Sequence, residues 1–448
     1  MALFGTDGVR GIANNQLTVS LALDVARGTA AELDSPAKVL IGRDTRVSSP
    51  MLESALAAGL AECGVDVILA GMVPTPALAY LIGAMRADAG IMISASHNPP
   101  EYNGIKLIDN AGRKWEPERE RRVEEAISSG RWPKPSSGRI GRILHHENSA
   151  VLAYHRYLAS IFAGLLPQGP IVIDVAHGAA AATAPQVFQM LGVPTTVLNG
   201  EPIGEAINVG CGATHPEHVR DAVLRMGASL GLAFDGDADR VIAVSGAGRI
   251  VDGDEILYVL ASHLDRQGAL VNREVVATVM SNLGLERALQ ARGIRLLRTP
   301  VGDRWVAKTM RDCGAQLGGE QSGHIIVKQW TETGDGLLTG LALLAALADE
   351  GMDLSQAVSD VERYPQVLTN VPLDGPLREW RSIPGLSELV EQAKAELGDE
   401  GRVLIRPSGT EPLLRIMLEG RDVERIEQWS HRLQAGVREA LESAEAQR

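Results

Sequence analysis

The sequence predicts three successive α/β domains with mixed sheets, followed by a smaller C-terminal α+β domain. Two observations support this fold class. Short apolar runs alternate with longer helical patterns through most of the 448 residues, and polar, glycine-rich loops follow many of these runs. From about residue 364 the order changes to strand, helix, two adjacent strands and helix, which is typical of an antiparallel sheet covered by helices.

The first block, residues 1–135, is expected to form one α/β domain. Its alternation of apolar runs and helical patterns predicts βαβ units and a largely parallel sheet. A polar stretch at 128–141, rich in proline, glycine and serine, is typical of a linker. The elements expected in order are a strand at 38–42, a helix at 50–63, a strand at 65–70, a helix at 75–86 and a buried strand at 89–94.

The alternation then starts twice more, which predicts α/β domains over residues 150–248 and 251–361. In the second domain we expect a strand at 171–175, helices at 182–191 and 216–226, and a strand at 229–234. In the third we expect strands at 275–280 and 294–298, helices at 285–292 and 303–313, and a buried helix at 337–348.

The last block, residues 364–445, is of a different kind. Two apolar runs at 402–405 and 413–418 follow each other without a helix between them, which predicts an antiparallel pair. Helices are expected at 387–397 and from 423 onward. We therefore expect a small α+β domain at this end of the chain.

Composition and charge narrow the class of protein. The formal net charge of −13 argues against a general attraction to nucleic acid or to an anionic membrane, so an anionic substrate needs a local cluster of arginine and lysine. The three cysteines lie far apart and indicate neither a disulfide framework nor a zinc site. No signal-peptide core stands at the N-terminus, and the stretch 337–348 is too short to span a bilayer. We expect a cytoplasmic protein.

The first of four chemically informative loops is Ser94-Ala95-Ser96-His97-Asn98-Pro99, directly after a predicted buried strand. Active groups of α/β proteins lie at such strand ends, which makes Ser96 a candidate nucleophile. A polar turn ended by two prolines explains the same residues about as well. A Ser-His-Asp hydrolase is less favoured, because neighbouring side chains of an extended segment point to opposite sides and there is no G-x-S-x-G elbow. Lys106 follows, within reach if the chain folds back.

The second loop, Asp235-Gly236-Asp237-Ala238-Asp239-Arg240, lies between two apolar runs. Three carboxylates on alternate residues repel one another unless a hard cation lies among them. An EF-hand is excluded, because Arg240 and Gly246 stand where glycine and glutamate are required. A solvated acidic turn is the plainer alternative. Mg²⁺ is favoured over Ca²⁺, because three protein oxygens and a phosphate suit octahedral coordination.

The remaining two loops are suited to bind a substrate rather than to react with it. Gly318–His324 carries Glu320, Ser322 and His324, which can present acceptors and donors to sugar hydroxyls, although an ordinary turn is the better explanation of this stretch taken alone. In Arg406-Pro407-Ser408-Gly409-Thr410-Glu411-Pro412, arginine, two hydroxyls and free backbone N–H groups are what a phosphate dianion requires. A plain β-turn is the alternative there. Together the four loops indicate phosphoryl transfer on a polyhydroxy substrate.

At this point the sequence resembles the α-D-phosphohexomutase family. The matching stretches cover essentially the whole chain in the family order: FGTDGVRG at 4–11, SASHNP at 94–99, YNGIK at 102–106, DGDADR at 235–240, GEQSGH at 319–324 and RPSGTEP at 406–412. The resemblance implies a heart-shaped architecture of four domains. It also suggests a homodimer, for which no residue pattern identifies an interface.

The resemblance implies roles for particular residues. Ser96 would carry a phosphoryl group, and this group would hold one Mg²⁺ ion together with Asp235, Asp237 and Asp239. Glu320 and Ser322 would bind sugar hydroxyls, and the non-reacting phosphate would be held by Arg406, Ser408, Gly409, Thr410 and Arg415. Residues around the transferring group would be Arg10, His97, Lys106, Arg240 and His324. One departure is Ala238, where the family usually has glycine; its methyl group narrows the backbone freedom of the loop.

The implied reaction interconverts glucosamine 6-phosphate and glucosamine 1-phosphate, with mannose or glucose phosphates as the alternative substrates. Glucosamine 1,6-bisphosphate would be the intermediate, and this bisphosphate or glucose 1,6-bisphosphate the activator. Lys106, Arg10 and His324 all remain candidates for the general base. The C-terminal domain would close as a lid during turnover, and the product would feed cell-wall amino-sugar synthesis. A phosphatase with the same serine and metal, or a non-catalytic sugar-phosphate binding protein, are the rival functions.

Overall fold

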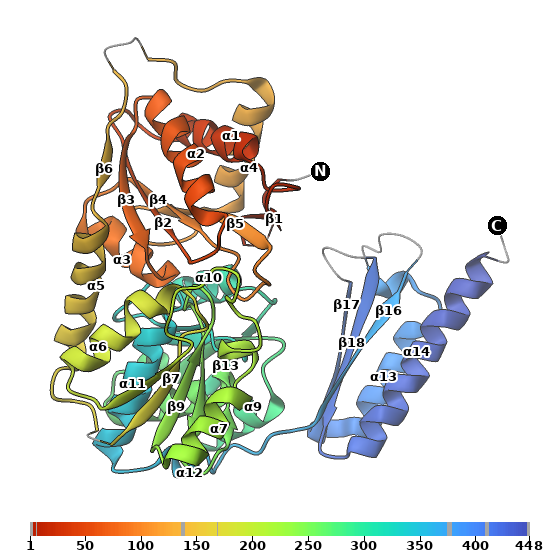
Figure 1. The fold of residues 1–448 in the computed structure, drawn as a ribbon. Coiled ribbons are helices and arrows are strands. Elements are labelled where there is room, and N and C mark those ends of the chain that lie inside the picture. The colour runs from red at the N-terminus through yellow and green to blue at the C-terminus, as the bar shows by residue number, and fades with distance from the viewer. Residues whose placement is uncertain are drawn as a thin grey trace. The chain divides into compact units, whose positions relative to one another are not determined.

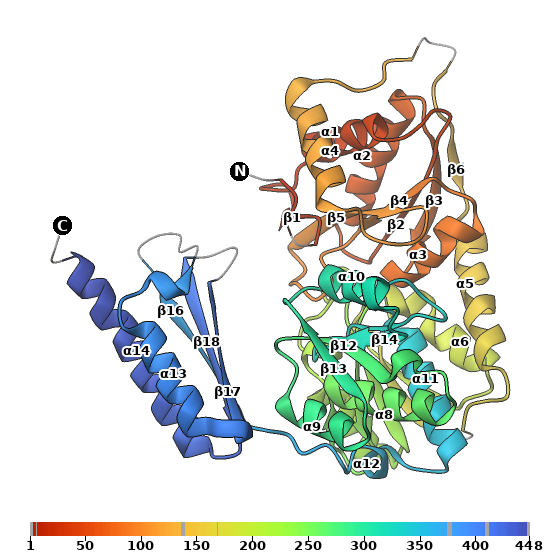
Figure 2. The same ribbon diagram turned by 180° about the vertical axis from the view of Figure 1, so that it is seen from behind.

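The fold is that of a computed structural model, which describes residues 3–5, 7–135, 139–167, 169–373, 379–407 and 412–445 (Figures 1 and 2). The chain divides into two compact units. The first comprises residues 1–280 and 294–359, and the second comprises 281–293 and 360–448. The first unit holds three sheets and the second holds one.

The first sheet has six strands in the order β1-β5-β4-β2-β3-β6. Its central strand β4 is buried along its whole length, as expected for an apolar strand covered on both faces. Helices α1, α2 and α4 lie over one face and α3 over the other (Figure 1). The strands are β1 (Val9–Ile12), β2 (Lys38–Arg43), β3 (Asp66–Met72), β4 (Ala89–Ile93), β5 (Tyr102–Asp109) and β6 (Ile143–His145), and the helices are α1 (Val19–Ala31), α2 (Ser49–Glu62), α3 (Thr75–Ala84) and α4 (Pro117–Ser129).

The antiparallel pairing within this sheet determines which residues lie next to the serine loop, residues 94–99. Strands β2, β3, β4 and β6 pair in parallel, but β5 turns back and pairs antiparallel with β4, so that Met92 is opposite Lys106. The chain therefore folds back after the serine loop, which is the condition under which Lys106 comes within reach of that loop. It brings Lys106 to the strand next to the one that ends before Ser96.

The second sheet has five strands in the order β11-β10-β9-β7-β8. Its β7, β8 and β9 are parallel, whereas β9 and β10 form an antiparallel pair joined by the loop 235–240. The strands are β7 (Ile171–Asp174), β8 (Thr195–Leu198), β9 (Leu230–Phe234), β10 (Val241–Ser245) and β11 (Ile250–Val251), and the helices are α5 (Glu147–Phe162), α6 (Ala184–Met190) and α7 (Glu217–Met226), with short 3₁₀ turns η1 (Ala179–Ala182) and η2 (Gly212–Thr214).

The third sheet has four strands in the order β13-β12-β14-β15, and only the last pairing, β14 with β15, is antiparallel. The predicted buried helix is confirmed as α11, whose central residues are almost all buried. The strands are β12 (Glu274–Thr278), β13 (Arg295–Thr299), β14 (Leu317–Gly319) and β15 (Ile325–Val327), and the helices are α8 (Gly253–Arg266), α10 (Asp303–Cys313), α11 (Gly336–Glu350) and α12 (Leu354–Ala357), with the 3₁₀ turn η3 (Val271–Arg273).

The second unit contains an antiparallel three-stranded sheet in the order β16-β18-β17, which confirms the prediction for the C-terminal block. Helices α13 and α14 cover one face of this sheet (Figure 1), and their apolar residues form its core with those of the strands. The elements are α9 (Leu283–Ala291), β16 (Gln366–Pro372), η4 (Trp380–Ser382), α13 (Leu386–Leu397), η5 (Gly398–Glu400), β17 (Gly401–Pro407), β18 (Leu413–Gly420) and α14 (Val423–Glu445).

A buried carboxylate joins α9 to this sheet. Glu419 on β18 is fully buried, and its carboxylate accepts hydrogen bonds from the backbone N–H of Leu283 and from the Gln366 amide, each at 2.9 Å. Arg402 on β17 pairs with the same carboxylate and also donates to the Ser281 carbonyl at 2.5 Å. The start of α9 is thereby tied to the central strand β18 and to the edge strand β17.

Replacing Glu419 with alanine is expected to lower the free energy of unfolding of the second unit by about 3 kcal/mol, because buried donors and a partly buried charge lose their partner. The matched control is Glu400→Ala, which removes an exposed carboxylate 3.0 Å from Arg421. That change is expected to cost less than about 1 kcal/mol. Hydrogen exchange of backbone amides in the unit measures both costs, and equal protection in the two variants would contradict the prediction.

Candidate active site

Ser96 lies in the turn that follows β4, with its hydroxyl aimed at a carboxylate of the second sheet. The hydroxyl donates a hydrogen bond to Asp235 Oδ2 at 2.7 Å, and it lies 3.4 Å from His97 Nδ1. The residue is 1% exposed, and its backbone is left-handed with φ of 52°. An L-residue adopts this conformation only when its surroundings enforce it.

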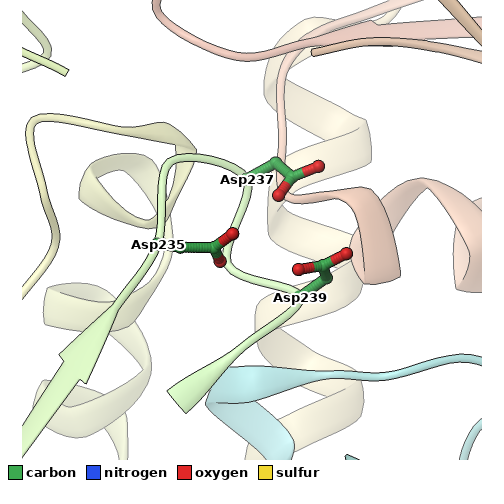
Figure 3. A group of neighbouring side chains, drawn as sticks. All are labelled: Asp235, Asp237 and Asp239. Carbon is green, nitrogen blue, oxygen red and sulfur yellow. The ribbon is translucent and has the colours of Figure 1, made fainter. Parts of the chain in front are cut away.

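Three aspartates meet in the loop between β9 and β10. The carboxylates of Asp235, Asp237 and Asp239 converge on one space (Figure 3), and one oxygen of each lies within 4.8 Å of the others. All three side chains are buried. The loop packs tightly against the serine loop, since a Cβ at Gly236 would lie 2.7 Å from the Ser96 carbonyl oxygen.

The electrostatics of these carboxylates fit a bound cation. Burial and the charges of Asp239 and Asp237 raise the pKa of Asp235 well above its usual range. Among the described residues, Asp237 Oδ1 and Asp239 Oδ1 have no hydrogen-bond partner although both atoms are buried. Buried oxygens without donors are costly unless they coordinate a metal. The set of three carboxylates therefore suits Mg²⁺, a hard ion that prefers oxygen ligands.

The other oxygens of the loop are held by cations and hydroxyls around it. Asp237 Oδ2 accepts hydrogen bonds from the Thr75 hydroxyl at 2.6 Å and from Lys106 Nζ at 2.8 Å. Burial opposes the charge of Lys106, but Asp237 and Asp7 outweigh it and raise the pKa of this lysine. Arg240 Nε lies 3.7 Å from Asp239 Oδ1. These contacts position the carboxylates but, among the described residues, give neither Asp237 Oδ1 nor Asp239 Oδ1 a hydrogen-bond donor.

His324 also contacts the aspartate loop, residues 235–240. Its Nδ1 lies 3.5 Å from Asp239 Oδ2, while its Nε2 accepts a hydrogen bond from the backbone N–H of Gly334 at 3.1 Å. Burial opposes protonation, yet the hydrogen bond and charge of Asp239 raise the pKa of His324. For His97 the balance is reversed, since burial and the charges of Arg240 and Arg10 lower its pKa to about 4.

A cleft of about 420 Å³ opens beside these groups. Most of the predicted residues around the transferring group and the sugar lie on its walls, but Lys106 does not line it and is only 1% exposed. Glu320 lies in the wall, where the backbone N–H of Gly302 donates to its Oε1 at 3.2 Å, and exposed Ser322 is nearby. The lining residues are Asp7, Arg10, His97, Asp239, Arg240, Thr278, Met280, Val301, Gly302, Asp303, Glu320, Gln321, Ser322 and His324.

Three charged residues that line the cleft or lie next to it, Asp7, Lys114 and Asp303, were not predicted from the sequence. Lys114 pairs with both Asp7 and Asp303, and Asp303 Oδ2 lies 3.8 Å from His324 Nε2. Burial of the Asp7 carboxyl acts to raise its pKa, but the charges of Lys106, Lys114 and Arg10 hold that pKa well below its usual range. A signal was available for Asp303, because it begins a predicted helix directly after a strand, where α/β proteins place functional groups. Lys114 stands in no motif that would single it out.

The predicted phosphate loop belongs to the second unit. Arg406 and Arg415 are direct partners across the antiparallel pair β17–β18. Burial and the charge of Arg415 lower the pKa of Arg406. Like charges placed opposite each other are unfavourable unless an anion binds near them. Ser408, Gly409 and Thr410, which were predicted to take part, lie outside the described residues.

Ala238 adopts a left-handed backbone with φ of 54° and is fully buried. Its N–H donates to the Asp235 carbonyl at 3.0 Å and its carbonyl accepts from the Gly336 N–H at 3.0 Å, so both backbone groups are satisfied. The loop thus retains a conformation that favours glycine, at a cost of about 1 kcal/mol for the alanine.

Comparison with known proteins identifies the family. Models of the phosphoglucomutase/phosphomannomutase family match four consecutive stretches: alpha/beta/alpha domain I at residues 1–134, domain II at 155–248, domain III at 252–364 and the C-terminal domain at 368–435. The chain belongs to the phosphoglucomutase/phosphomannomutase family. Its mixed sheets and four-domain organisation are those of the phosphohexomutases.

Several curated family members are similar along nearly their whole length. A phosphoglucosamine mutase from Thermoanaerobacter pseudethanolicus is 48% identical over 436 residues, covering 96% of this chain and 97% of that protein. A phosphoglucosamine mutase from Desulforamulus reducens is 46% identical over 430 residues, covering 95% and 96%.

Solved structures of the family share the fold. A phosphoglucomutase/phosphomannomutase family protein from Burkholderia thailandensis matches with a TM-score of 0.80 and 25% identity, covering 99% of this chain and 98% of that one. The N-acetylphosphoglucosamine mutase of Aspergillus fumigatus, solved with GlcNAc-6P and magnesium, matches with a TM-score of 0.67 and 17% identity, covering 98% and 96%. In the part of the chain that the structure describes, no helix is long and apolar enough to cross a membrane.

Proposed function

We propose that this phosphohexomutase interconverts glucosamine 6-phosphate and glucosamine 1-phosphate through a phosphorylated Ser96. The observation that carries the proposal is the position of the Ser96 hydroxyl, 2.7 Å from one of three buried aspartates at the edge of a cleft. A nucleophile next to a metal-binding group is the arrangement that phosphoryl transfer requires. The choice of the amino sugar is supported by the similarity to phosphoglucosamine mutases.

Each predicted site residue has a part in this proposal. Asp235, Asp237 and Asp239 hold one Mg²⁺ ion together with the phosphoryl group on Ser96. When bound, the ion neutralises negative charge on the transferring group. Arg10, His97, Arg240 and His324 surround that group, and buried Lys106 holds Asp237 in place. Glu320 and Ser322 bind sugar hydroxyls, and Arg406 and Arg415, with Ser408, Gly409 and Thr410, bind the phosphate that does not react.

The reaction then proceeds in two transfers. In the first, the C1 hydroxyl of glucosamine 6-phosphate bonds to phosphorus while the bond between phosphorus and Ser96 Oγ breaks; the hydroxyl proton passes to a general base, for which Lys106, Arg10 and His324 are the candidates, and Ser96 Oγ takes up a proton. In the second, the bisphosphate has turned over in the cleft; Ser96 Oγ bonds to the 6-phosphorus and loses its proton, while the bond between phosphorus and O6 breaks and O6 takes up a proton. Glucosamine 1-phosphate leaves. Glucose 1,6-bisphosphate activates the chain by phosphorylating Ser96, and positioning supplies most of the remaining acceleration.

A coupled assay with Mg²⁺ and catalytic glucose 1,6-bisphosphate tests the substrate. We expect kcat/KM for glucosamine 6-phosphate to exceed that for glucose 1-phosphate or mannose 1-phosphate by about 100-fold, because a site that pairs with a polar group rejects analogues lacking it. Preference for glucose or mannose would favour the phosphoglucomutase or phosphomannomutase alternative. Release of free phosphate without any bisphosphate would instead indicate a phosphatase.

A further inference from the structure

We propose that Arg46 and Asn208 are positioning residues for phosphoryl transfer, because together they hold the backbone of the serine loop that presents Ser96. The inference rests on the proposed function of Ser96. Neither residue lines the cleft, so each acts through the loop rather than on the substrate.

Arg46 lies beneath the serine loop, in the segment between β2 and α2, and its side chain is fully buried. One guanidinium nitrogen, Nη2, donates to the carbonyl oxygens of Ser96 at 3.0 Å and Asn98 at 2.7 Å. The other, Nη1, donates to the Tyr102 carbonyl at 2.9 Å and also to the Pro99 carbonyl. The planar guanidinium therefore fixes four carbonyl groups from the serine loop to the start of β5.

Asp44 balances the charge of this arginine. Its Oδ2 accepts from Arg46 Nε at 2.9 Å, and its Oδ1 accepts from the Ser49 hydroxyl at 2.9 Å. Both members of the pair are fully buried. A buried ion pair costs more in desolvation than an apolar pair of the same shape, unless further hydrogen bonds satisfy its charges. The four carbonyl groups bonded by Arg46 supply those hydrogen bonds.

Asn208 holds the same loop from the chain that follows β8 in the second sheet. Its side-chain amide donates to the carbonyl oxygens of Ser96 at 2.9 Å and Asn98 at 3.1 Å. Each of these two carbonyls thus receives one hydrogen bond from Arg46 and one from Asn208. Both lone pairs of each oxygen therefore accept a hydrogen bond, which fixes the orientation of the serine loop.

The hydrogen bonds from Arg46 and Asn208, together called the clamp, also affect the part of the serine loop that holds Ser96 and His97. The C=O and the following N–H of a planar trans peptide point in opposite directions. Because the Ser96 carbonyl is directed at Arg46, the N–H of His97 points away from Arg46. Among the described residues, no acceptor bonds that N–H group. The same contacts hold Ser96 in its left-handed conformation, with φ of 52°. The clamp therefore fixes both the Ser96 hydroxyl and a neighbouring donor able to bind a phosphoryl oxygen.

The test measures how fast Ser96 takes up a phosphoryl group from glucose 1,6-bisphosphate, by rapid quenching and intact-mass spectrometry of the full chain. Asn208→Ala is expected to slow this step about tenfold and Arg46→Lys about 100-fold, since one or more hydrogen bonds to the loop are lost. In steady state, kcat should fall while KM for the sugar phosphate changes by less than about twofold. Asn208→Ala leaves no charge unpaired, so it carries the test if Arg46→Lys does not fold.

The matched control is Thr45→Val. The Thr45 hydroxyl donates to the His177 carbonyl at 2.7 Å, which joins the same two parts of the chain without contacting the serine loop. This variant is expected to lose thermal stability but to phosphorylate at the natural rate. An unchanged rate in Asn208→Ala, an equal slowing in Thr45→Val, or a loss confined to KM would each overturn the proposal. If Ser96 of the natural chain takes up no phosphoryl group, the proposed function fails instead.

Discussion

Ser96→Ala is expected to lower kcat for the sugar phosphate by at least about 10⁴-fold, because the alanine has no atom that can carry the phosphoryl group. The Ser96 hydroxyl, in the turn after β4, donates to Asp235 Oδ2 of the aspartate loop at 2.7 Å. Incubation with glucose 1,6-bisphosphate, followed by peptide mapping, should find phosphate on the peptide containing Ser96 in the natural chain and none in the variant. The coupled assay then measures the loss of turnover.

The control for this change is Ser54→Ala, which removes an exposed hydroxyl that bonds the Pro50 carbonyl within α2. It is expected to keep full turnover and to map phosphate to Ser96. Turnover in Ser96→Ala above about one tenth of the natural rate would show that another residue carries the group. In that case the loop would serve binding, and phosphate should map elsewhere in the chain.

The strand ends that carry the chemistry could be predicted because short, continuous apolar runs mark them clearly. The run at 89–94 is β4 (Ala89–Ile93), and the run at 229–234 is β9 (Leu230–Phe234). Each is followed by polar residues that cannot continue a buried strand. Alternating acidic residues also predicted the convergence of carboxylates, because a loop this short between two paired strands has few ways to direct them.

What the sequence could not predict is which distant side chains meet at these loops. Arg46 precedes Ser96 by 50 residues, and Asn208 follows it by 112. Their meeting depends on β2 lying beside β4 and on how the second sheet packs against the first. Asp303 reaches the cleft for a similar reason, from the start of α10. No local pattern encodes such contacts, since they follow from strand order and from packing.

Compared with the natural chain, Asp235→Asn is expected to be more stable without Mg²⁺ and less stable with it. Without the ion, three buried carboxylates repel one another, and this repulsion with burial raises the pKa of Asp235. A neutral asparagine of the same shape removes part of the repulsion and should raise the metal-free free energy of unfolding by about 1 kcal/mol. With the ion, the variant lacks one ligand charge, and kcat should fall by at least about 100-fold.

Thermal unfolding in chelator and in excess Mg²⁺ separates these effects, because a ligand that binds only the folded chain stabilises it by about 2.7 kcal/mol at 100 times its Kd. We expect Mg²⁺ to raise the Tm of the natural chain and to leave that of Asp235→Asn nearly unchanged. Asp221→Asn, which alters an exposed carboxylate on α7, should respond to Mg²⁺ like the natural chain. Lower stability of Asp235→Asn in chelator would show that repulsion at Asp235 does not destabilise the metal-free chain. An unchanged response to Mg²⁺ would show that Asp235 is not a ligand of the ion.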